Sequence, residues 1–323
     1  MSAVNNRSSW VRLEKFSITV ASGSNRLYAN GRQQVKLRVE IEAWDAARKP
    51  VRLSEREISS IRLIQYHGGE EIHFNSRRFF LSLNGDRLWT STTMHDEQYR
   101  YYPSQGRADL LDVGGTLSSN ASSRQATTYQ DFYVQSIADT TLRVAAKITR
   151  DDGEVFTTLG RTAGSVTLVP VDIPKYGPED YAFNPVTIVE QGSVVYDYIP
   201  FSLNSTHGNV EFRSFHMGSS VARYTQTTNN RTIGVFTGFV RPGESHIGYY
   251  SSAPTAPREI QQGYVLPGRP VIVVVRGTNV DLNTAPRPRS SAIASAVDMY
   301  GNPHEVTLLF KASEGDDRAL VLY

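Results

Sequence analysis

The chain has 323 residues, of which 34 are Lys or Arg and 32 are Asp or Glu, so its formal net charge is only +2. This balance argues against a nucleic-acid binder, because such proteins usually concentrate a basic excess on one surface. The absence of cysteine excludes disulfides, thiolate metal sites and cysteine nucleophiles.

The first 50 residues predict antiparallel strands. In residues 35–43 an apolar side chain at every odd position alternates with Lys, Arg or Glu, which places one face of a strand in a core and the other in water. The outer face carries both signs of charge, which can pair with neighbouring strands. Phe16, Ile18 and Val20 alternate in the same way, and Asn30-Gly31 between the two segments is typical of a tight turn.

Residues 54–66 leave two interpretations open. Ser54 followed by Glu57 fits a capping box at the start of a short helix, and apolar residues follow at 58, 61 and 63. The same residues are equally consistent with a turn that leads into a strand over 61–66.

Turn signals predict two further hairpins with an irregular region between them. Alternation over residues 79–83 leads to Asn84-Gly85, and Asp151-Asp152-Gly153 follows a strand over 142–149. Residues 91–128 show few apolar residues at any period. A stretch of this length in a compact domain is typical of a functional loop, although a solvated linker fits equally well.

Period-2 patterning continues to the C-terminus and predicts an all-β protein. The unbroken apolar run over 271–275 is expected of a strand buried on both faces. The closing residues Ala-Leu-Val-Leu-Tyr are too apolar for an exposed tail and are expected to complete a sheet, in this subunit or in a neighbour. From residue 165 to the C-terminus, strands are expected at 165–171, 186–190, 193–201, 210–216, 222–227, 232–240, 246–251, 271–275, 293–297, 306–310 and 320–323.

Four prolines between positions 170 and 185 favour a connection between domains. We therefore expect two β-sandwich, immunoglobulin-like domains over residues 1–172 and 186–323, joined by residues 173–185. A second exposed loop is expected around Pro286 and Pro288.

Two turn segments resemble the bacterial immunoglobulin-like repeats of invasin- and intimin-type adhesins. Residues 29–51 contain an Ala-x-Gly entry, the alternating strand and an Asp-Ala-x-x-x-Pro-Val hairpin, in which Arg48 stands where the family has a turn glycine. Residues 297–303 repeat the theme and keep the Gly-Asn-Pro turn. The resemblance covers about 30 residues. It implies a β-sandwich with a binding or structural role and implies no catalytic residue.

The residues indicate no catalytic, metal or cofactor site. None of the seven histidines has the spacing that places two imidazoles on one metal, and a local cluster such as His95-Asp96-Glu97 is more typical of exposed polar residues than of metal ligands. Residues 279–283 lack the glycine and the acidic residue of a calcium loop. Residues 243–246 only approach the nucleophile elbow of a serine hydrolase, and there is no glycine-rich phosphate loop.

Arginine and tyrosine are the enriched residue types, with 28 Arg against 6 Lys, and 17 Tyr. Both types are favoured at protein interfaces, although codon usage and β propensity explain the same bias. Clusters in expected loops and the apolar C-terminal strand therefore become interaction candidates. These are Tyr99, Arg100, Tyr101, Tyr102, Tyr249, Tyr250, Arg287, Arg289, Leu320, Val321, Leu322 and Tyr323.

Three functions follow as hypotheses. The first is a non-catalytic structural protein that forms homo-oligomers or filaments through its Arg- and Tyr-rich surfaces. The second is a secreted module that binds a glycan or another protein, and the third is a hydrolase with a loop-built site. The first ten residues contain no apolar run and no segment is long enough to span a membrane, so we expect a cytoplasmic protein or one released without a Sec signal.

Overall fold

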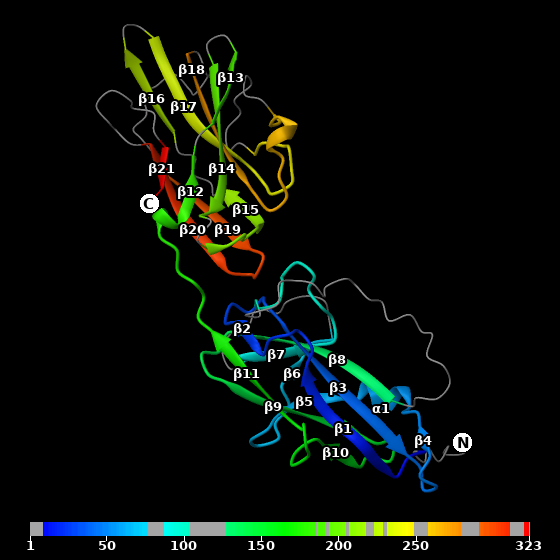
Figure 1. The fold of residues 1–323 in the computed structure, drawn as a ribbon. Helices are drawn as coiled ribbons and strands as arrows, with labels where there is room; N and C mark the ends of the chain where they lie inside the picture. The colour runs from blue at the N-terminus through cyan, green and yellow to red at the C-terminus, as the bar shows by residue number, and fades with distance from the viewer. Residues whose placement is uncertain are drawn as a thin grey trace, which may run out of the picture. The chain divides into compact units, whose positions relative to one another are not determined.

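The computed structural model confirms an all-β protein and divides into two compact units, residues 1–173 and 174–323 (Figure 1). The structure describes residues 9–76, 87–103, 127–184, 186–191, 194–204, 207–217, 223–228, 231–248, 258–278, 291–310 and 320–322.

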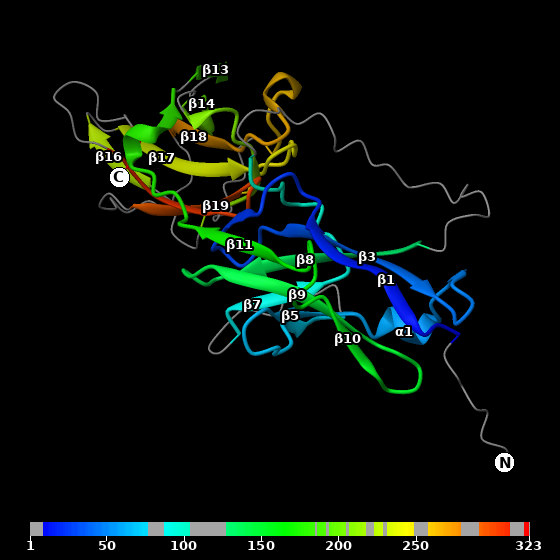
Figure 2. The same ribbon diagram turned by 60° about the horizontal axis from the view of Figure 1, so that its bottom comes forward.

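The first unit contains two sheets. One has the order β1-β3-β8-β7-β6, with β4 also paired to β3. Its strands are β1 (Arg12–Val20), β3 (Val35–Trp44), β4 (Pro50–Val51), β6 (His73–Phe74), β7 (Trp89–Thr92) and β8 (Thr127–Ser136). The other has the order β10-β9-β11-β2, with β5 also paired to β9. Its strands are β2 (Arg26–Tyr28), β5 (Arg62–Gln65), β9 (Leu142–Thr149), β10 (Val155–Thr157) and β11 (Val166–Val171). Strands β11, β9 and β10 can be followed together in Figure 2.

A single apolar core joins these two sheets. The odd residues of β3 are all buried and the even residues are partly exposed, which confirms the alternation read from the sequence. Leu37, Val39 and Ile41 pack with Leu63 and Ala146 from the opposite sheet. On the outer face, Arg38 and Lys36 both pair with Asp131 of β8, as the mixed charge of that face predicts.

Both interpretations of residues 54–66 are partly correct. Helix α1 (Glu55–Ser59) begins with the capping box, because the Ser54 hydroxyl accepts the Glu57 backbone N–H and the Glu57 carboxylate accepts the Ser54 N–H. Strand β5 then follows at Arg62.

The second unit also contains two sheets. One has the order β12-β14-β18-β17-β16, with β13 also paired to β14, and the other has the order β15-β19-β20-β21. The strands of the first are β12 (Tyr181–Phe183), β13 (Val186–Gln191), β14 (Val194–Leu203), β16 (Arg223–Thr228), β17 (Arg231–Val240) and β18 (Val271–Thr278). Those of the second are β15 (Phe212–Met217), β19 (Ala292–Asp298), β20 (Pro303–Phe310) and β21 (Leu320–Leu322).

Two sequence expectations for the second unit are confirmed. Strand β18 is buried on both faces, because Ile272 and Val274 enter one apolar cluster whereas Val273 and Val275 enter another. The C-terminal strand completes a sheet of its own chain, since β21 pairs antiparallel with β20.

Other expectations need correction or lie outside the described residues. Residues 246–248 form only isolated bridges rather than a strand, and residues 181–183, within the expected connection, form β12 on β14. The Asn84-Gly85 hairpin and the Pro286 loop lie outside the described residues.

The hairpins β3–β4 and β19–β20 contain the same turn, one in each unit. In the first, the Asp45 carboxylate accepts the Lys49 N–H at 2.8 Å and the Arg48 N–H donates to the Asp45 carbonyl at 3.1 Å. In the second, the Asp298 carboxylate accepts the Asn302 N–H at 2.8 Å and the Gly301 N–H donates to the Asp298 carbonyl at 3.0 Å. The shared geometry explains the sequence echo between the two segments.

The fourth residue of this turn lies in the left-handed region, with φ of 85° at Gly301 and 60° at Arg48. Arg48→Gly is therefore expected to stabilise the first unit by about 0.5–1 kcal/mol, because glycine avoids the steric cost of this conformation. Urea unfolding monitored by tryptophan fluorescence measures the change, because all three tryptophans of the chain lie in the first unit, at Trp10, Trp44 and Trp89. The matched change Gly301→Arg should destabilise the second unit. A loss of stability on Arg48→Gly would contradict this account of the turn.

Candidate binding surface

Residues 93–103 of the irregular region are fixed to the first unit by two buried glutamines. The Gln34 side-chain oxygen accepts the Asp96 backbone N–H at 2.9 Å. The Gln33 side-chain amide donates to the Arg100 carbonyl at 3.1 Å and its oxygen accepts the Tyr28 N–H at 2.7 Å. This part of the region is therefore a held loop, and residues 104–126 lie outside the described residues.

Two neighbouring tyrosines of the predicted cluster occupy different environments. Tyr101 stacks on the His95 ring, and His95 stacks in turn on Tyr133 of β8, with ring centroids 5.0 Å apart in each pair. Tyr101 thus closes a three-ring stack on the outer face of the sheet. Tyr102 packs instead against Tyr28 of β2, with centroids 5.0 Å apart.

Tyr102 lines a groove of about 750 Å³ beside β2 and β11. The Arg26 guanidinium carbon lies 5.1 Å from the centre of the Tyr102 ring. Asn25, Ser24 and Thr167 contribute polar groups to the same groove, and the Asn25 amide donates to the Thr167 carbonyl at 2.7 Å. Among the described residues Arg26 forms no ion pair, so its planar donor group is held by a ring rather than by a carboxylate.

Sequence reasoning identified Tyr102 but missed Arg26, Asn25 and Thr167. These residues meet because β2 pairs in parallel with β11, which places Arg26 opposite Val169. A parallel pairing between segments about 140 residues apart leaves no local signal in the sequence.

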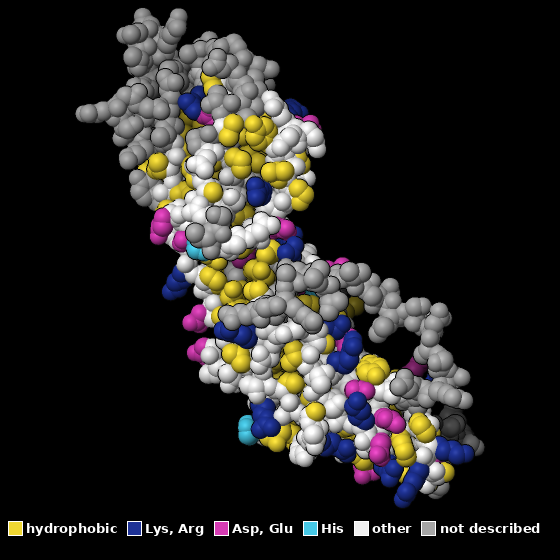
Figure 3. Space-filling model, viewed as in Figure 1, with side chains coloured by type: hydrophobic (Ala, Val, Ile, Leu, Met, Phe, Trp, Pro, Cys, Tyr) yellow, Lys and Arg dark blue, Asp and Glu magenta, His cyan; other side chains and the backbone are white. Residues whose placement is uncertain are grey.

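The charged outer face of β3 and β8 differs from the groove because its charges are already paired. Arg38 donates two hydrogen bonds to Asp131, at 2.7 and 2.9 Å, and Lys36 lies 3.0 Å from the same carboxylate. Although partial burial opposes ionisation, these hydrogen bonds hold the pKa of Asp131 below its ordinary value. Figure 3 shows basic and acidic side chains interspersed on the visible face of this unit.

The remaining candidates are distributed over the chain. Tyr99 and Arg100 lie in the held loop, and the Arg100 carbonyl serves as an anchor. Leu320, Val321 and Leu322 form β21, and Leu320 packs in the core of the second unit. Tyr249, Tyr250, Arg287, Arg289 and Tyr323 lie outside the described residues. Homo-oligomerisation stays a prediction.

In the described part of the chain, no group of three or more His, Asp or Glu residues is placed to hold a metal ion. The described residues also contain no helix long and apolar enough to cross a membrane.

The second unit contains a buried chain of polar rings that sequence reasoning did not find. The Tyr181 hydroxyl lies 3.0 Å from His304 Nδ1, and His304 Nε2 lies 3.4 Å from Asp298. Burial raises the pKa of the Tyr181 hydroxyl well above its ordinary value. The side chains of His304 and Asp298 are 1% exposed, so these polar groups lie in the interior of the second unit.

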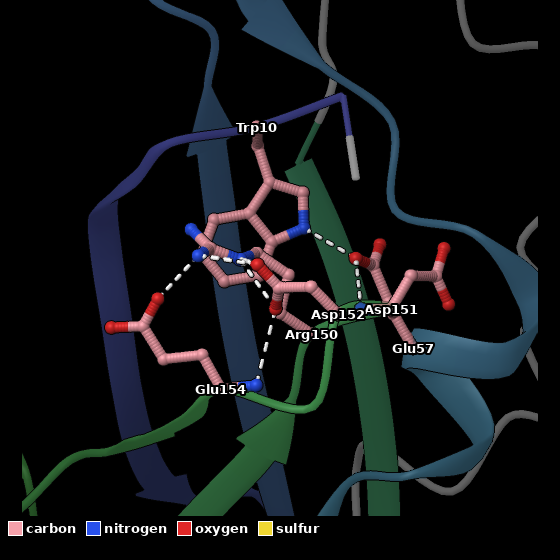
Figure 4. Close-up of polar contacts among 6 residues, drawn as sticks. All are labelled: Trp10, Glu57, Arg150, Asp151, Asp152 and Glu154. Carbon is pink, nitrogen blue, oxygen red and sulfur yellow. Dashed lines mark hydrogen bonds and ion pairs between the residues drawn. The ribbon is translucent and has the colours of Figure 1, made fainter. Parts of the chain in front are cut away.

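A polar cluster in the first unit surrounds the buried residues Trp10 and Glu57 (Figure 4). Glu57 of α1 accepts hydrogen bonds from the Trp10 indole at 2.8 Å and from the Asp151 N–H at 3.2 Å. The Arg150 guanidinium lies 5.3 Å from the Trp10 ring and pairs with Asp152 and Glu154. The cluster joins the segment before β1, helix α1 and the β9–β10 turn.

Comparison with known proteins adds little to these observations. No protein-family model matches the sequence, and no curated protein matches it. Among solved structures, the Yersinia pseudotuberculosis adhesin InvE is similar at 11% identity and a TM-score of 0.21, over 95% of this chain and 63% of that one. The chain thus spans less than two thirds of that structure.

A second similar structure is the sialic acid binding region of a Streptococcus sanguinis SK1 adhesin bound to 3'sLn. The identity is 10% and the TM-score 0.21, over 91% of this chain and 76% of that one. At these TM-scores neither likeness carries an argument about function.

Proposed function

We propose that this chain is a non-catalytic binding protein that takes an acidic saccharide in the Tyr102 groove. The proposal rests on the position of the Arg26 guanidinium. It lies over the Tyr102 ring in an open groove and has no carboxylate partner among the described residues. A guanidinium fixed in this way offers paired donors that match a carboxylate.

The other lining groups suit the remainder of a saccharide. The Asn25 amide and the Ser24 and Thr167 hydroxyls are hydrogen-bond donors and acceptors of the kind that sugar hydroxyls require. These groups support the binding of a saccharide beside Arg26.

Arg26→Gln is expected to weaken binding about ten- to hundredfold, because a charge-assisted hydrogen bond contributes about 1.5–3 kcal/mol. A glycan array that holds neutral and acidic saccharides would identify the ligand, and isothermal titration with the full chain would give the affinity. Tyr102→Ala should weaken binding as well, since it removes the ring that holds Arg26 in place.

Arg12→Gln is the matched control. Arg12 also lies over an aromatic ring of the first unit, 4.9 Å from the centre of Trp44, but it does not line the groove. Its replacement should leave the affinity unchanged. Equal losses with Arg12→Gln and Arg26→Gln, or no preference for acidic over neutral saccharides, would contradict the proposal.

A further inference from the structure

Strand β8 is longer than its neighbour β7, so part of one edge has no strand beside it. Residues 133–136 pair with β7, whereas β3 pairs with residues 127–134 on the other side. Among the described residues, nothing pairs with the β7 side of residues 127–132.

The register shows which backbone groups face this open edge. The Ile137 N–H donates to the Leu88 carbonyl, and hydrogen-bonded pairs recur at every second residue of an antiparallel ladder. The backbone N–H and carbonyl groups of the odd residues of β8 therefore face the β7 side, and beyond the end of β7 these residues are Asp131, Tyr129 and Thr127. The Asp131 carbonyl accepts the Gln130 side-chain amide at 3.0 Å. The edge consequently presents the N–H groups of Tyr129 and Asp131 and the carbonyl of Tyr129.

A pocket of about 490 Å³ lies beside the same edge. Its apolar walls are Ile58 of α1, Ile61, Phe74 of β6 and Phe132 of β8. Phe132 belongs to the inward face of β8, whereas Tyr129 lies on the outward face and is 54% exposed. A strand added at this edge would direct every second side chain to the pocket side of the sheet.

The edge also lacks the usual protection against pairing. Natural edge strands are commonly blocked by proline, lysine or a bulge. Residues 127–132 read Thr-Thr-Tyr-Gln-Asp-Phe, without proline or lysine, and their pairing with β3 shows no register shift.

We infer that the edge of β8 takes an extended segment of another protein as an added strand, with one apolar side chain of that segment in the pocket. Only an extended backbone supplies donors and acceptors at the two-residue repeat of this edge, and the adjoining pocket selects for side chains at alternate positions. This site is separate from the Tyr102 groove and does not depend on saccharide binding.

The test uses ten-residue random peptides displayed on phage and selected on the full chain. Enriched peptides should carry apolar residues at alternate positions. Tyr129→Pro should weaken their binding at least tenfold, because proline removes an edge N–H that the β3 ladder does not use. Ser59→Trp, which places a large side chain at a residue that lines the pocket, should have a similar effect. Tyr129→Ala, the control, removes the ring but keeps the N–H and should change the affinity less than threefold.

Amide hydrogen exchange provides a second readout. The N–H groups of Tyr129 and Asp131 should exchange rapidly in the chain alone and become protected when a selected peptide binds. Protection in the chain alone would show that the chain covers its own edge. That result would overturn the inference, as would a failure to enrich peptides or equal effects of Tyr129→Pro and Tyr129→Ala.

Discussion

Glu57→Ala is expected to lower the free energy of unfolding of the first unit by about 3–4 kcal/mol. The Glu57 side chain accepts hydrogen bonds from the Trp10 indole and from the backbone N–H groups of Ser54 and Asp151. Glu57 is only 1% exposed, and its bond with the Trp10 indole is buried, so the loss of this acceptor costs about 1–3 kcal/mol. The part-buried N–H groups of Ser54 and Asp151 add the loss of the helix cap, about 1 kcal/mol, and a smaller contribution from the turn. The substitution also releases the segment before β1 from α1 and from the β9–β10 turn.

Urea unfolding monitored by tryptophan fluorescence measures this loss of stability, because the tryptophans report on the first unit. The emission of Trp10 should also shift in the folded variant, since its indole N–H loses its carboxylate acceptor. Glu55→Ala changes an exposed carboxylate of the same helix and should alter stability by less than about 0.5 kcal/mol. Similar losses for the two variants would show that Glu57 does not hold the cluster together.

Asp298→Ala is expected to destabilise the second unit by about 3–4 kcal/mol. Asp298 accepts the Tyr300 and Asn302 backbone N–H groups and the Asn302 side-chain amide, at 2.8, 2.8 and 3.1 Å. All three donors lose their acceptor in the variant, and His304 Nε2 loses its nearest carboxylate.

Asp45→Ala is the matched control because Asp45 occupies the same turn in the first unit at a solvated position. Water replaces its lost hydrogen bond, so a cost of about 1 kcal/mol is expected. Circular dichroism follows both units during urea unfolding, whereas tryptophan fluorescence follows only the first. Asp298→Ala should shift the circular dichroism transition without shifting the fluorescence transition. Equal costs for the two substitutions would show that burial does not set the strength of this turn.

The sequence predicts those parts of the fold that depend on neighbouring residues. The alternation of β3 follows from burial of one face, and the capping box at Ser54 joins residues only three positions apart. Apolar runs such as that of β18 likewise indicate burial on both faces. These features are local, so composition and period are sufficient to identify them.

The candidate sites depend on contacts that the sequence does not display. Glu57 and Trp10 are 47 residues apart, and Arg26 meets Tyr102 because Gln33 links β2 to the loop at Arg100. In the sequence the tyrosines at 99–102 form a single cluster. In the structure, however, Tyr101 belongs to a ring stack and Tyr102 lines a groove. The open edge of β8 depends on where β7 ends, which no pattern within β8 records.

We propose above that the Tyr102 groove binds an acidic saccharide. Amide chemical-shift mapping of the full chain with the acidic saccharide that gives the highest array signal tests it most directly. We expect the shifts to concentrate at residues 23–26, at Tyr102 and at Val166 and Thr167, and to disappear in the Arg26→Gln variant. Shifts confined to the second unit, or to the outer face of β3 and β8, would contradict the assignment of the groove as the binding site.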